Sequence, residues 1–154
     1  MGTFEDLFET DDELATNGVP IDYGENSKGG KIVFWVAEAG NPNHEKQQRR
    51  RAKALDRARG KPDVQRKLTC EIVADSILPK WAGVLDANEK EIEPTRDNKI
   101  MYLFKYKKFF LDVMEAAMDM RNFRASAEDD MGEDYVPISA GTLKTEKVST
   151  GSKV

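Results

Sequence analysis

The sequence has 154 residues, the usual size of one domain, and charged residues make up 34% of it. No stretch approaches the roughly 18 apolar residues that a membrane span requires, and the acidic N-terminus lacks the apolar segment of a secretory signal. These features predict a soluble protein that is not associated with a membrane, and a single cysteine excludes an internal disulfide.

The charge is distributed in blocks. Residues 1–26 contain eight acidic residues and no Lys or Arg, whereas residues 44–67 contain ten Lys or Arg and three acidic residues. Residues 128–134 are acidic again. Such alternation predicts head-to-tail self-association or binding to a charged partner, while solvated faces and flexible ends are an equally acceptable interpretation.

The N-terminal region predicts an arm followed by a β-hairpin. Residues 1–17 form the acidic arm, and its few apolar side chains can dock it onto the body of the protein. Residues 21–24 and the β-branched, aromatic run 31–37 predict two paired strands, because residues 25–30 have the composition of a turn.

The next segment predicts two helices. Residues 44–59 are rich in helix-forming residues, with Asn43 as the expected N-cap and Gly60 as the stop signal. Pro62 suits the first turn of a second helix, which covers residues 63–80 and has one apolar face.

Two further helices are expected after a turn. Residues 80–94 predict a turn or small hairpin around the sequence DANEK, and Thr95 is the expected N-cap of a helix over residues 96–105. A last amphipathic helix is expected over residues 107–127, followed by a flexible tail over residues 128–154. The predicted fold is therefore mainly α (α+β): one domain over residues 18–127, in which a small N-terminal β-hairpin precedes a bundle of about four helices.

Few residues are suited to catalysis or metal binding. His44 is the only histidine and is expected to be exposed or to cap a helix, and Cys70 is expected to be a small core residue. The sequence has no phosphate-binding loop and no G-x-G-x-x-G motif. We therefore expect a protein that is not an enzyme and that binds no metal or cofactor.

The basic helix 44–59 leaves an alternative open. Arg49, Arg50 and Arg51 can neutralise phosphates, which would make the protein a small nucleic-acid-binding regulator. However, no aromatic residues are interleaved with them for base stacking, and consecutive residues on a helix point about 100° apart. Nucleic-acid binding is therefore the less favoured interpretation.

Four segments, in this order, resemble the tail assembly chaperones of long-tailed bacteriophages. They are LFETDDELATNGVPIDYG (7–24), KIVFWVAEAGNPN (31–43), ILPKWAGVLDANEKEIEPTRDNKIMYLF (77–104) and FFLDVMEAAMDMRNF (109–123). The third segment is the strongest match, with a tryptophan after a helix, an acidic turn, a short strand, and then a Thr-capped helix. Asn88-Glu89 stands where a glycine is usual in that turn.

The resemblance implies a function in the host cytoplasm. Members of that family bind the tape measure protein and the tail tube protein during tail assembly, and they are absent from the finished virion. The alternative within phage biology is a structural tail or head-tail connector subunit, which would remain in the particle. Self-association is expected as well, with the acidic arm of one copy against the basic helix of the next.

Candidate client contacts are adaptable apolar side chains. Met101, Met114 and Met118 are the partner-binding candidates, with Met120 near them, because methionine fits many shapes and therefore suits an irregular apolar client. Trp81 and the three consecutive arginines complete the set of candidate partner-binding residues. For the methionines and for Trp81, an ordinary position in the core is the competing and more common interpretation.

Overall fold

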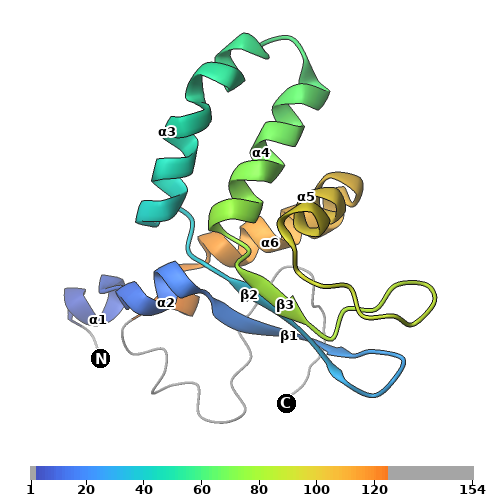
Figure 1. Cartoon of the computed structure of the whole chain (residues 1–154). Coiled ribbons are helices and arrows are strands. Elements are labelled where there is room, and N and C mark those ends of the chain that lie inside the picture. The colour runs from blue at the N-terminus through green and yellow to red at the C-terminus, as the bar shows by residue number, and fades with distance from the viewer. Residues whose placement is uncertain (1–2, 125–154) are drawn as a thin grey trace.

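The structure is a computed structural model that describes residues 3–124 (Figure 1). The three strands are β1 (Val19–Glu25), β2 (Lys31–Val36) and β3 (Lys80–Ala82). The helices are α1 (Phe4–Phe8), α2 (Asp12–Asn17), α3 (Pro42–Arg57), α4 (Pro62–Ser76), α5 (Arg96–Lys105), α6 (Lys107–Met118) and the 3-10 helix η1 (Met120–Phe123). The predicted fold, mainly helical with an N-terminal β-hairpin, is confirmed.

The strands form one antiparallel sheet in the order β1-β2-β3. Phe34, in the central strand, pairs with Ile21 of β1 and with Trp81 of β3. All three side chains are buried, so this row forms the sheet's contribution to the core. The predicted hairpin is present and begins at Val19, but β3 was not predicted, because three residues are too short to show the alternation of a strand.

Three helix boundaries differ clearly from the sequence-based prediction. The helix predicted over residues 63–80 is too long, because α4 ends at Ser76 and Lys80 already belongs to β3. Asn41, rather than Asn43, is the N-cap of α3: its side chain accepts a hydrogen bond from the His44 N–H at 3.0 Å. Pro42 then occupies the first helical turn, where its missing N–H costs nothing. At the other end of the domain, α6 stops at Met118, because Asp119 is extended and its side chain caps η1. The predicted helix over 107–127 is therefore too long, and the predicted tail lies outside the described residues.

Most helix signals in the sequence are confirmed. The Thr95 side chain accepts a hydrogen bond from the Asn98 N–H at 3.2 Å, and α5 covers residues 96–105 as predicted. Pro62 begins α4. The expected small hairpin after β3 is present as a bridge between Leu85 and Glu91.

The predicted acidic arm consists of two short helices with different surroundings. Ala15 of α2 is buried, and its carbonyl accepts a hydrogen bond from the Glu38 N–H at 2.8 Å. Immediately before α2, the Asp11 N–H donates to the Phe123 carbonyl at 2.8 Å. By contrast, α1 makes no extensive contact with any other element within residues 3–124, and Figure 1 shows it at the edge of the molecule.

The helices bury their apolar faces against one another and against the sheet. Figure 1 shows α3 and α4 side by side as an antiparallel helical hairpin, with α5 crossing next to α4 and α6 below it. The fully buried helical side chains include Val73 of α4, Leu103 of α5 and Val113 of α6. Tyr23 of β1 donates a hydrogen bond to Asp112 and ties the sheet to α6. Among residues 3–124, no helix has both the length and the apolarity that crossing a bilayer requires.

Candidate protein-interaction surface

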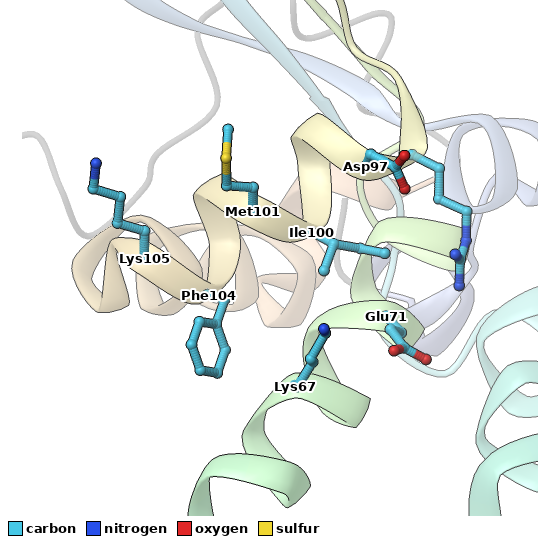
Figure 2. Close-up of a pocket in the computed structure, with 8 residues that line it drawn as sticks. Lys67, Glu71, Asp97, Ile100, Met101, Phe104 and Lys105 are labelled. Carbon is cyan, nitrogen blue, oxygen red and sulfur yellow. The ribbon is translucent and has the colours of Figure 1, made fainter.

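A groove between α4 and α5 is the candidate site (Figure 2). Its central part has a volume of about 470 Å³, and a neighbouring hollow of about 390 Å³ shares Lys67, Glu71 and Phe104 with it. The two hollows therefore form one surface along α4. In Figure 2, Ile100 and Phe104 of α5 point toward α4, from which Lys67 and Glu71 face them.

The floor of this groove is apolar because two helices place apolar residues one turn apart. Ile100 and Phe104 lie at i and i+4 on α5, and Val64 and Leu68 do the same on α4. Arg66 holds the Phe104 ring in place, since its guanidinium carbon lies 4.4 Å from the ring centre and the group also donates to the Phe104 carbonyl.

An ionic network forms the end of the groove and joins three helices. Asp75 of α4 accepts hydrogen bonds from Arg51 of α3 at 2.8 Å and from Arg96 of α5 at 2.7 Å. Arg51 also bonds Glu71, at 3.2 Å. Burial by itself would raise the pKa of the Asp75 carboxyl, but the hydrogen bonds and charges of Arg96 and Arg51 outweigh it and lower this pKa.

The three predicted arginines do not share a surface. Arg51 is largely buried in the ionic network, whereas Arg49 and Arg50 are exposed on α3. Arg51 therefore fixes the angle between α3 and α4 and is not available to a partner. The exposed positive charge of α3 comes instead from Lys46, Arg49, Arg50, Lys53 and Arg57.

The candidate methionines are also separated. Met101 is 48% exposed and lines the α4–α5 groove. Met118 is 70% exposed at the end of α6, next to the exposed Met120. Met114 is half-buried against the core. Only Met101 of this set belongs to the groove.

Trp81 lies in the core. Its side chain is 5% exposed, and its indole N–H donates to the Ile92 carbonyl at 2.7 Å. The ring makes edge contacts with Phe34 and Tyr102, whose ring centres are 5.8 and 6.4 Å away. These contacts match the competing interpretation of Trp81 as an anchor between the sheet and the helices.

Neither His44 nor Cys70 lies in the candidate groove. His44 is buried, so the expectation of an exposed side chain is wrong. Its Nδ1 accepts a hydrogen bond from the Gly40 N–H at 2.8 Å, and burial lowers its pKa. Cys70 is fully buried, as expected, and burial raises the pKa of its thiol. Over the part of the chain that the structure describes, no three His, Cys, Asp or Glu side chains are grouped as metal ligands.

Sequence reasoning missed the groove residues Ile100, Phe104 and Val64. Val64 belongs to the apolar face predicted for the helix over residues 63–80, and Ile100 and Phe104 are four residues apart on the helix predicted over residues 96–105. Such spacing does not by itself indicate a groove. Whether such a face is covered depends on the crossing of α4 and α5, which no local pattern specifies.

Together, the fold and the groove define a small, mainly helical α+β protein with a helix-lined concave surface. The sequence model of the family described as YdaY prophage protein matches residues 36–134, from the last residue of β2 through all of α3, α4, α5, α6 and η1. The chain therefore belongs to the YdaY prophage protein family and is phage-derived. No curated protein and no solved structure matches the chain.

Proposed function

We propose that this phage protein is a tail assembly chaperone that binds the tape measure protein and the tail tube protein during tail formation. Its phage origin agrees with this role, and the resemblance of the four sequence segments points to tail assembly in particular. The role requires no catalysis, and we expect the protein to act in the host cytoplasm and to be missing from the finished virion.

The resemblance is supported by the local structure of its strongest segment. Trp81 is followed by the tight turn of residues 86–90 and then by the Thr95-capped α5, in the order expected of the family. The short strand expected between turn and helix is reduced to the bridge between Leu85 and Glu91. Glu89 has a φ of 62°, the left-handed conformation that glycine adopts most easily. The turn thus has the backbone of a glycine turn although its sequence departs from that pattern.

The observation that carries the proposal is the α4–α5 groove. A tape measure protein is a long helical chain with apolar stripes, and such stripes aggregate when they are left uncovered. A groove with the apolar floor of Ile100 and Phe104 and charged side chains at its margins is suited to an amphipathic helix. Met101 at its edge adapts to the varying side chains of a long client.

Co-expression with the tape measure protein and with the tail tube protein, followed by pull-down, tests this function. We expect both to co-purify with the wild-type chain. Met101→Glu should weaken tape measure binding by about tenfold or more, because it places a charge on the apolar surface of the groove. Met118→Glu is the matched control: Met118 is more exposed than Met101 but does not line the groove, so the same charge there should leave binding unchanged.

Failure of both clients to co-purify would remove the chaperone role. Mass spectrometry of purified virions distinguishes a chaperone from a structural tail or connector subunit, because the structural subunit would be found in every particle. Detection of this chain at a fixed copy number in mature virions would therefore favour the structural subunit.

A further inference from the structure

A second groove, between α3 and α4, opens on the face of α4 opposite to the α4–α5 groove. It has a volume of about 590 Å³. Ala52 and Leu55 of α3, Ile72 and Val73 of α4, and Met114 of α6 supply its apolar lining. Nothing in the proposed chaperone role uses this surface.

The α3 side of this groove carries positive charge. Arg59 lines the groove directly, and it pairs with Asp56, the one acidic side chain of the lining. Arg49 and Lys53 precede Asp56 by seven and three residues, so helical spacing places them along the same edge of α3. Both are exposed. An apolar helix with acidic flanks is therefore the complementary ligand.

The chain itself contains such a helix. Phe4, Leu7 and Phe8 lie at i, i+3 and i+4 of α1, and their side chains are 72%, 44% and 51% exposed. This is the spacing with which amphipathic helices fill grooves. Six acidic residues and no basic residue occur between positions 5 and 13.

The arm that carries α1 is fixed near the body of its own chain. The Asp11 N–H bonds the Phe123 carbonyl, and Thr10 bridges Arg124, so the chain is held within two residues of the end of α1. Figure 1 shows α1 beyond α2 at the edge of the molecule and not alongside α4. This arrangement presents α1 outward, to another molecule.

We infer that α1 of one copy docks in the α3–α4 groove of a second copy, with Phe4, Leu7 and Phe8 on the apolar floor and the acidic residues of the arm against α3. The interface is head-to-tail, so each copy offers one arm and one groove, and assembly continues into a ring or an open chain. It uses a different face of α4 from the proposed client groove and does not depend on which client is bound.

Sedimentation of the full chain at low and high salt, with and without nuclease treatment of the sample, tests this pairing. The wild type should self-associate at low salt, and high salt should weaken the association because part of the attraction is between exposed charges. The arm variant Phe4→Ala/Leu7→Ala/Phe8→Ala and the groove variant Ala52→Glu should each weaken self-association by about tenfold or more. All four positions are exposed, so circular dichroism should show an unchanged fold.

A mixture of the two variants gives the decisive result. The arm variant keeps its groove and the groove variant keeps its arm, so together they should form one-to-one pairs and nothing larger. Val64→Ala, on the opposite face of α4, is the control and should self-associate like the wild type.

Three results would overturn the inference. The first is wild-type association in either the arm variant or the groove variant. The second is a monomeric wild type at low salt, which would mean that the arm occupies its own groove or none. The third is association that disappears on nuclease treatment, which would show that the basic side chains of α3 bind nucleic acid and not the arm of another copy.

Discussion

Two buried polar residues, Asn41 and His44, hold the start of α3 against the rest of the molecule. The Asn41 amide donates to the carbonyls of Glu38 and Ser76 while its oxygen caps α3. The His44 ring accepts from the Gly40 N–H. The Asn41 side chain thus uses both its amide and its oxygen, as burial favours. The sequence-based prediction placed the cap at Asn43, although Pro42 suits the first helical turn and so favours Asn41. The hydrogen bond to the Ser76 carbonyl adds a tertiary contact that the sequence does not reveal.

His44 predicts a pH-dependent stability. Burial lowers its pKa below the ordinary value of 6.5, and the weaker opposite effect of Glu45 does not restore it. The contribution of neutral His44 is therefore complete above pH 6.5 and is lost as the pH falls toward the lowered value. We expect the free energy of unfolding of the wild type to fall over this range relative to that of His44→Asn, which keeps an acceptor but does not titrate.

Urea unfolding at a series of pH values measures this difference. Comparison with the variant is needed because the pKa of Glu38 is raised, first by burial and then by Asp12. A raised carboxyl pKa makes stability fall as the pH rises, which is the opposite sign. A constant difference between the two proteins across the range would contradict the prediction.

At the scale of elements, β3 depends on a close approach that only glycine permits. Gly83 directly follows β3 and has a φ of 77°, and a Cβ atom there would lie 1.9 Å from the Lys31 carbonyl oxygen. The Asn26 side chain donates to the Gly83 carbonyl at 2.9 Å, which joins this turn to the hairpin loop. The sequence predicted a turn over residues 80–94, which includes Gly83. It did not predict that β2 passes beside this glycine.

Gly83→Ala and Gly60→Ala form a matched pair that separates backbone strain from the clash. Gly60 has a φ of 82°, and a Cβ atom there would meet open space. We expect Gly60→Ala to cost about 1–2 kcal/mol, the strain of a left-handed alanine. Gly83→Ala should cost about 2 kcal/mol more, because the sheet must also move. Thermal or urea unfolding of both variants measures the costs, and equal losses would show that the strand pairing is not as described.

At the scale of the whole molecule, one carboxylate connects α4 and α5, which line the candidate groove, with the neighbouring helix α3. Asp75 bonds Arg51 of α3 and Arg96 of α5 from its place on α4. Lys99 of α5 adds hydrogen bonds to the carbonyls of Ala74 and Leu78, at 2.9 and 3.0 Å. The angle between α4 and α5, and with it the width of the groove, therefore depends on polar contacts as well as on the core.

Asp75→Asn should lower the free energy of unfolding by about 1–3 kcal/mol, because it weakens charge-assisted hydrogen bonds and leaves Arg51 and Arg96 with less compensation. The control is Asp56→Asn, which removes an exposed pair with Arg59 on α3 and should cost no more than about 0.5 kcal/mol. Chemical denaturation at neutral pH compares the two. Losses of equal size would mean that the network does not hold the helices together.

The sequence by itself determined the elements whose signals are local. The strong β-branched run before Ala37, the Pro62 helix start and the Thr95 cap predicted the hairpin and helices, since each signal acts within a few residues. Tertiary structure alone decided that β3 pairs with β2. It also decided that Arg51 is buried whereas Arg49 is exposed, and that Met101 is exposed whereas Met114 packs against the core. These depend on how helices cross and which chain segments meet, so residues far apart in the sequence settle them together.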